Sequence, residues 1–181
     1  MNGQVTVLAG PPAAGKTAVA GLLTTGAGNP AVHLVTDQFY RSIRTGFVLP
    51  FLPEAFRQNE VVLDAIVRTT ATFARGGYDV VVDGVIGPWF LSHFRALAEQ
   101  GLPVSYIVLR PDLDTTLARA RGRVGELKDV DAITGLHGAF AQLGDLERHV
   151  IDSGGHDVEQ TAAVVRRVLA SGEHRLRQPR R

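Results

Sequence analysis

The sequence predicts an α/β domain in which a parallel β-sheet is covered by helices on both faces. Short apolar segments rich in β-branched residues alternate along the chain with longer segments of helical spacing. The apolar segments are apolar throughout, which is typical of strands that are buried on both faces. The 181 residues hold no internal repeat and no low-complexity linker, so we expect one domain over residues 1–171 and a basic, flexible tail over residues 172–181.

The predicted elements follow one another in a regular order. An apolar strand at 4–9 is separated by a Gly- and Pro-rich loop from a helix near 16–25. The same short apolar pattern predicts further strands at 31–36, 78–84, 104–110 and 148–153, and helical spacing predicts helices near 54–75, 89–99, 112–121, 130–144 and 157–170. Gly101 is a stop signal for the helix before it, and Asp157 with Gln160 has the spacing of a capping box.

The composition excludes several classes of protein. The absence of cysteine excludes disulfides, zinc–thiolate sites and thiol nucleophiles. The N-terminal segment lacks the pattern of a signal peptide, and no window holds about 18 uninterrupted apolar residues. We therefore expect a cytoplasmic protein that does not associate with membranes. The net charge of +1 gives no field that would attract nucleic acid, so we do not expect a nucleic-acid partner.

The segment GPPAAGKT at 10–17 matches the phosphate-binding loop G-x-x-x-x-G-K-[ST], and it lies between a predicted strand and a predicted helix as that motif requires. Backbone N–H groups and a helix N-terminus concentrate positive potential there, while the glycines let the backbone wrap a phosphate. The flanking elements argue against a chance Gly/Pro turn before a lysine. The predicted nucleotide-binding residues of the loop are Gly10, Pro11, Pro12, Ala13, Ala14, Gly15, Lys16 and Thr17.

The side chains of the loop have distinct expected roles. Lys16, one of only two lysines in the chain, adds a full charge toward the β- and γ-phosphates. Thr17 would place its hydroxyl on Mg²⁺. Because Pro11 and Pro12 have no N–H, the donors of the cradle must come from residues 13–17.

The order VLAGPPAAGKT, LVTDQF, VVVDGV, YIVLRPDLDTTLARARGR and VIDSGG resembles the P-loop small-molecule kinases over residues 4–170. The most similar groups are the chloramphenicol-phosphotransferase-like and the gluconate- or shikimate-kinase-like ATP-binding proteins. The resemblance implies the P-loop NTPase fold, with a five-stranded parallel sheet of order 2-3-1-4-5. It also implies transfer of a phosphoryl group from ATP, with Mg²⁺, to a small hydroxylated acceptor.

Two carboxylates follow neighbouring predicted strands. Asp37 follows the second strand and Asp83 ends the third, so both should lie at the carboxyl edge of the sheet, where ligands bind. In kinases of this kind an acid at the position of Asp37 contacts the acceptor hydroxyl and can accept its proton; the alternative is an N-cap for a helix that starts at Gln38. Asp83 has the pattern of a carboxylate that holds Mg²⁺, and its alternative is a turn residue before Gly84. The chloramphenicol-phosphotransferase pattern has a second acid where this chain has Gly84.

Arginines near the helix at 112–121 resemble the start of a kinase lid. Arg119 and Arg123 are four residues apart and share a face if the helix continues, whereas Arg121 points elsewhere. A guanidinium there could stabilise the charge of the transferred phosphoryl group, and the alternative for each arginine is a solvated surface residue. In the loop VIDSGGH, Ser153 and Gly154 resemble residues that border the adenine.

The acceptor side is predicted from residues around the second and third strands. Arg41 and Arg44 are three residues apart, so they share a face if that segment is helical, and they could bind an anionic or polyhydroxylated acceptor. We interpret TGFVLPFLPEAF at 45–56 as a mobile flap, and we call this segment the flap below. Six aromatic residues would rim the pocket and suit an acceptor with an apolar face, or else pack into the core: Tyr40, Phe47, Phe51, Phe56, Trp89 and Phe90.

The leading hypothesis is an ATP-dependent small-molecule phosphotransferase with Lys16, Asp37, Arg119 and Arg123 as its catalytic residues. One alternative is a nucleoside or nucleotide kinase. Another is a slow ATPase switch that acts on a protein partner, although the chain is short for an AAA+ module and lacks a guanine-specificity motif.

Overall fold

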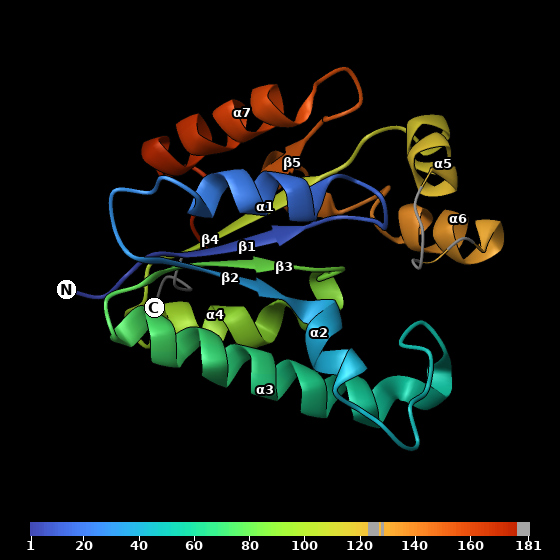
Figure 1. Cartoon of the computed structure of the whole chain (residues 1–181), viewed down its shortest axis with the longest axis horizontal. Coiled ribbons are helices and arrows are strands. Elements are labelled where there is room, and N and C mark those ends of the chain that lie inside the picture. Colours follow the sequence, from blue (N-terminus) through green and yellow to red (C-terminus); the bar gives the residue numbers. More distant parts are fainter. Residues whose placement is uncertain (123–126, 128, 177–181) are drawn as a thin grey trace.

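The computed structural model describes residues 1–122, 127 and 129–176, and within them one parallel sheet lies between two layers of helices (Figure 1). The strands are β1 (Val5–Ala9), β2 (Ala31–Val35), β3 (Asp79–Asp83), β4 (Val104–Leu109) and β5 (Val150–Ile151). They pair in parallel in the order β2-β3-β1-β4-β5, which confirms the predicted fold class and strand order. The four longer strands agree with their predicted ranges to within one residue at each end. The fifth strand, β5, has only two residues within its predicted range of 148–153.

Long helices cover both faces of the sheet. Figure 1 shows α1 (Lys16–Thr24) and α7 (Val158–Ser171) on one face, and α3 (Phe56–Arg75) and α4 (Leu91–Glu99) on the other. Three further helices lie beyond the carboxyl ends of the strands: α2 (Thr36–Arg41), α5 (Leu113–Arg121) and α6 (Val130–Ala139). Three 3₁₀ turns complete the described elements: η1 (Pro53–Ala55), η2 (Pro88–Phe90) and η3 (Gly144–His149).

Alternate residues of each strand enter two different cores. Val80 and Val82 belong to the cluster under α3 and α4, whereas Val81 packs with Leu8 and Val19 under α1 and α7. Both sets are buried in β1, β3 and β4, which explains why these strands carry apolar residues on both faces. The same alternation places the side chain of Asp83, two residues after Val81, on the face that α1 covers.

Two helical predictions differ from the structure. The predicted strand at 31–36 ends one residue early because α2 begins at Thr36, a helix that the spacing analysis did not assign. The helix predicted at 130–144 ends at Ala139, and its last turn tightens where Phe140 N–H donates to the carbonyl of His137. By contrast, the capping box is confirmed, since Asp157 accepts from Gln160 N–H and the Gln160 side chain accepts from Asp157 N–H. No helix in the described part of the chain combines the length and the apolar character needed to cross a bilayer.

Residues 174–176, which belong to the tail predicted to be flexible, are hydrogen-bonded to β4. Tyr106 N–H donates to the carbonyl of His174 at 3.0 Å, and Leu176 N–H donates to the carbonyl of Val104 at 2.8 Å. Leu176 is buried at 7% exposure. The segment covers the outer edge of β4 ahead of the short β5, and residues 177–181 lie outside the described residues.

The imidazole of His149 is buried beside this segment. Its Nδ1–H donates to the carbonyl of Tyr106 at 2.9 Å, and its ring lies edge-on to that of His174 at 5.4 Å. Nε2 accepts from the guanidinium of Arg148 at 3.3 Å, so a second ring proton would have to face a positive charge. Burial, with smaller contributions from the nearby His174 and Arg148, lowers the pKa of His149 from 6.5 to about 4.

We expect this histidine to make the fold less stable as the pH falls from about 6.5 to about 4. Between these two pH values the histidine binds a proton in the unfolded chain but stays neutral in the folded chain. The free energy of unfolding should therefore fall by about 2 kcal/mol across this range and should not change above about pH 6.5. Urea denaturation at several pH values measures the change. His149→Gln, which keeps a donor for the Tyr106 carbonyl, should flatten the profile; an unchanged slope in that variant would assign the pH dependence to other groups.

Candidate active site

The loop at 10–17 leaves β1 and enters α1 through a backbone that most residues avoid. Gly10, Ala13 and Gly15 have positive φ angles of 142°, 58° and 92°, and Ala13 is the only non-glycine residue with a positive φ in the described part of the chain. A Cβ on Gly10 would lie 2.1 Å from the carbonyl oxygen of Leu109. The glycine is therefore required where the loop passes the end of β4.

The loop presents unpaired backbone donors. Among the described residues, the N–H groups of Ala13, Gly15 and Thr17 have no hydrogen-bond acceptor, and Gly15 caps α1 without a side-chain bond. The N-terminus of α1 adds the positive end of its dipole at the same place. Such a concave set of N–H groups suits a phosphate, so the geometry fits the nucleotide-binding role predicted for this loop.

Lys16 is the first residue of α1, and its charge lies inside the curve of the loop. Its Nζ donates to the carbonyl of Pro11 at 2.8 Å, and the residue is 8% exposed. Ala14 N–H reaches the same carbonyl at 3.4 Å. A buried ammonium is costly unless oxygen atoms surround it, and phosphate oxygens would compensate its charge better than a neutral carbonyl.

Asp83 ends β3 as a buried carboxylate, 2% exposed. Its Oδ2 accepts a hydrogen bond from His33 Nε2, at 3.3 Å, across the β2–β3 pair. Gly84 continues away from the sheet, and a Cβ there would lie 2.2 Å from Thr36 Oγ1, so the glycine lets β3 leave beside the start of α2. The side chain bonds to a neighbouring strand and not to a turn, which argues against the turn alternative.

Thr17 and Asp83 fit the donor set of a magnesium ion that also binds phosphate oxygens. The Thr17 residue is exposed, and Asp83 lies on the sheet face that α1 covers. The described residues contain no group of three or more His, Asp or Glu that could hold a metal ion by themselves. Mg²⁺ commonly takes one or two protein ligands and completes its shell with substrate phosphates and water.

The sequence analysis did not single out His33. The histidine is the third residue of β2, and the register places it opposite Val81 of β3. Asp83 lies two residues after Val81, so the side chains of His33 and Asp83 are on the same face of the sheet. This register follows from knowing that β2 is the neighbour of β3. Once the strand order is known, a histidine two residues before the end of β2 can be predicted to contact the acid that ends β3.

We expect His33→Ala to weaken Mg²⁺-dependent nucleotide binding about tenfold, because Asp83 would lose the donor that orients it. Calorimetric titration with ADP in the presence of Mg²⁺ and with ADP plus a chelator separates the two effects. His33→Gln, whose amide can still donate, should recover part of the loss. An equal weakening with and without the metal would mean that His33 supports the loop or the fold instead.

Asp37 is the second residue of α2, and it is exposed. The N-cap of this helix is Val35, and no side chain caps it, so the N-cap alternative for Asp37 is wrong. Its carboxylate makes no hydrogen bond to another described residue. The nearby Tyr40 is half-buried, and burial together with the charge of Asp37 raises the pKa of Tyr40 to about 12. Asp37 is thus accessible to an acceptor, with a neutral hydroxyl beside it.

The other predicted acceptor residues lie along the same edge. Arg41 is the last residue of α2 and Arg44 lies beyond it, so the expected shared helical face is wrong, although both arginines are exposed. Trp89, in η2, is 46% exposed and packs edge-on against Phe140 at 5.7 Å. A Cβ on Gly87 would lie 2.2 Å from the Trp89 ring, so this glycine makes room for the indole.

The predicted lid and base-loop residues are in contact. Arg119, on α5, donates from its guanidinium to the carbonyl of Ser153 at 3.1 Å, and the Ser153 hydroxyl is buried with no partner among the described residues. Arg121 lines a cavity of about 250 Å³ between α5 and α6, away from Ser153. Arg123 lies outside the described residues. The catalytic roles of Arg119 and Arg123, and the base contacts of Ser153 and Gly154, stay predictions.

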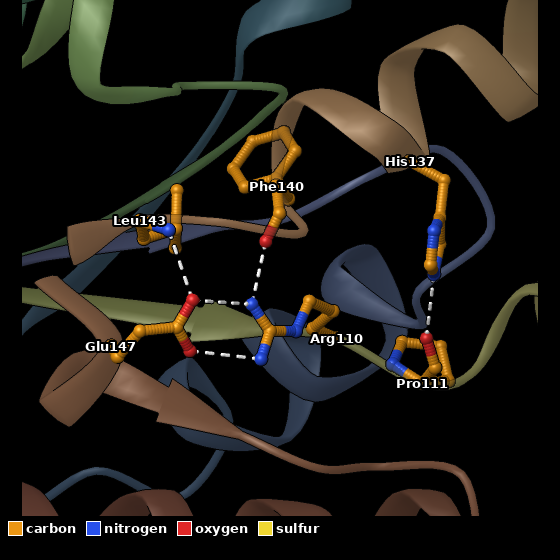
Figure 2. Close-up of polar contacts among 6 residues, drawn as sticks. All are labelled: Arg110, Pro111, His137, Phe140, Leu143 and Glu147. Carbon is orange, nitrogen blue, oxygen red and sulfur yellow. Dashed lines mark hydrogen bonds and ion pairs between the residues drawn. The ribbon is translucent and has the colours of Figure 1, made fainter.

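A polar network that the sequence analysis missed joins the lid region to the sheet. Figure 2 shows the guanidinium of Arg110, just after β4, paired with both carboxylate oxygens of Glu147 at 3.0 and 2.9 Å and bonded to the carbonyl of Phe140. Arg110 holds the pKa of Glu147 below its ordinary value. His137 Nε2–H donates to the carbonyl of Pro111. These contacts anchor the segment that carries α6 to the carboxyl end of β4.

Comparison with known proteins agrees with this geometry. The profile of a family described as an AAA domain matches residues 5–140, and no curated protein matches the chain. The structure of the Deinococcus radiodurans tunicamycin resistance protein is similar, with 19% identity, a TM-score of 0.66 and coverage of 97% of this chain and 99% of that one.

Two kinase structures are similar to the same degree. A sugar kinase from Janibacter sp. has 18% identity and a TM-score of 0.66, with coverage of 93% of this chain and 95% of that one. The Mycobacterium tuberculosis APS kinase in complex with AMPPNP and APS has 18% identity and a TM-score of 0.66, with coverage of 93% and 98%. The chain therefore has the fold and the length of P-loop kinases, and the short length that argued against an AAA+ module is that of these kinases.

Proposed function

Because the chain belongs to the AAA domain family and folds as a P-loop kinase, we propose that it transfers the γ-phosphoryl group of ATP to a hydroxyl of a small-molecule acceptor. The observation that carries the proposal is the loop at 10–17, where a buried ammonium and unpaired N–H groups face the edge at which Asp83 and Asp37 also lie. An accessible carboxylate beside a phosphate site suits phosphoryl transfer to a hydroxyl.

The proposed roles follow from the positions of the residues. The loop N–H groups and Lys16 bind the β- and γ-phosphates, and Ser153 and Gly154 border the base. Thr17 and Asp83 would hold Mg²⁺, which when bound offsets phosphate charge. Arg119 stabilises the transferred group, a role that Arg123 would share. The acceptor-side residues are Asp37, Tyr40, Arg41, Arg44 and Trp89.

The proposed chemical step is a direct displacement. The acceptor hydroxyl oxygen forms a bond to the γ-phosphorus, the bond from that phosphorus to the β–γ bridging oxygen breaks, and ADP leaves with the electron pair. Asp37 accepts the hydroxyl proton as the new bond forms, which a carboxylate can do late in a loose transition state.

The test is transfer from γ-labelled ATP with Mg²⁺ into a library of hydroxylated metabolites, nucleosides and antibiotics. A labelled small product that forms with wild-type protein and is lost on Lys16→Ala supports the proposal and identifies the acceptor. Labelled nucleotides alone would assign the activity of a nucleotide kinase. Release of inorganic phosphate alone, at a rate independent of the library, would contradict the proposal and favour an ATPase switch.

A further inference from the structure

The flap leaves large apolar side chains in solvent. Five of its residues, Phe47, Leu49, Phe51, Leu52 and Phe56, are between 38% and 70% exposed. Buried Phe side chains cover roughly 150–250 Å² each, so these five expose on the order of 500 Å² together. An apolar area of this size is comparable to the largest apolar patch of a typical monomer, and such patches are often functional. The alternative in which the flap aromatics pack into the core does not hold for Phe47, Phe51 and Phe56.

The backbone of the flap is held in place by polar side chains of α3. Gln58 accepts from Val48 N–H at 2.9 Å and donates to the carbonyl of Val48 at 2.7 Å. Asn59, 8% exposed, donates to the carbonyl of Pro50 at 2.8 Å. These bonds satisfy the polar backbone of the flap and fix its course, while the apolar side chains stay outside. These bonds argue against the mobility predicted for the flap, which is an anchored loop that presents an apolar surface.

The flap lies at the edge of the sheet where the proposed chemistry takes place. It follows α2, the helix that carries Asp37, and Figure 1 shows it in teal beyond the same end of the strands as the phosphate loop and α5, on the side of the sheet that α3 covers. The exposed arginines Arg41 and Arg44 lie between Asp37 and the first apolar residue of the flap. Along the chain, a charged and hydrogen-bonding stretch thus gives way to an apolar one.

We propose that the acceptor is an amphipathic alcohol, with its hydroxyl-bearing polar end at Asp37 and Arg41 and its apolar body on the flap. This inference rests on the proposed function and adds the class of its acceptor. A second copy of the chain is the competing occupant, but a specific interface buries about 800 Å² on each partner, more than the flap exposes. The polar stretch beside the flap also matches a ligand with one polar and one apolar end.

The test combines kinetics with direct binding. Phe47→Ser and Phe56→Ser should raise KM for the acceptor about tenfold or more, with kcat and KM for ATP unchanged. Val61→Ser is the matched control, because Val61 is 64% exposed on α3 but lies outside the flap. In calorimetry, octyl β-glucoside below its micelle concentration should bind the wild type at least about tenfold more tightly than the two flap variants, and methyl β-glucoside should not.

The outcomes separate this inference from the proposed function. If the protein phosphorylates only wholly polar acceptors and the flap variants have the wild-type KM for the acceptor, the inference is wrong but the proposed function is still supported. No product with any compound would refute the function, and with it the acceptor role of the flap. A dimer that Phe56→Ser dissociates would assign the flap to a second copy. Octyl glucoside binding that Val61→Ser reduces as much as Phe56→Ser would also overturn the inference.

Discussion

Lys16→Ala should lower phosphoryl transfer by about three orders of magnitude while the chain stays folded. The Lys16 ammonium lies inside the phosphate loop, 2.8 Å from the carbonyl of Pro11, and supplies its full positive charge. Preorganised donors at a developing charge are each worth about a hundred- to a thousandfold in rate. The Pro11 carbonyl keeps Ala14 N–H as a donor in the variant, so the loop retains a closing hydrogen bond. Steady-state transfer from labelled ATP measures the rate.

The control for this variant separates charge from packing. Lys16→Met retains most of the aliphatic length of the side chain and removes the ammonium, so it should be as inactive as Lys16→Ala but closer to wild type in thermal stability. Both variants should bind nucleotide more weakly. Transfer at the wild-type rate in Lys16→Met would show that the loop is not the donor site, and the proposed function would then fail.

Asp37→Asn should lower kcat by about a hundred- to a thousandfold and leave KM for ATP unchanged. An amide cannot take the hydroxyl proton, and general-base assistance is commonly worth about 10²–10⁴ in rate. The residue is exposed on α2 and does not cap it, so the free energy of unfolding should change by less than about 0.5 kcal/mol. Loss of rate without loss of stability is the combination that a structural residue would not produce.

Gln38→Ala is the matched control for Asp37, since Gln38 is the next exposed residue of the same helix. It should keep full activity. Equal loss of rate in Gln38→Ala and Asp37→Asn would mean that α2 matters as a structural unit and that Asp37 is not the base.

The sequence analysis succeeded where a signal lies within a few neighbouring residues. The phosphate loop is complete in eight consecutive positions, and its flanking strand and helix have their own periodicities. The strands at 4–9 and 104–110 were found because a two-sided core favours apolar residues on both faces of a strand. The analysis missed α2 because Thr36–Arg41 is too short to show a helical period, and its start is set by the end of β2 and not by a cap.

The predictions about individual side chains were less accurate, because their positions depend on residues that are distant in the sequence. Arg41 and Arg44 were expected on one helical face, but α2 ends at Arg41, a boundary that nothing in the local sequence marks. The exposure of the flap aromatics also could not be read from their type, because the same residues could fill a core. Their exposure depends on where Gln58 and Asn59 hold the flap relative to α3.

The α/β class, the phosphate loop with Lys16 and Thr17, and the positions of the two acids at the carboxyl edge of the sheet can be predicted without a structure, because each is encoded by residues that are neighbours in the chain. The folded chain is needed to show that His33 bonds to Asp83, that Arg119 contacts Ser153 and that Arg110 pairs with Glu147. The partners in these pairs are 34 to 50 positions apart. Such contacts depend on strand order and register, which are fixed when the two cores are packed on opposite faces of the sheet.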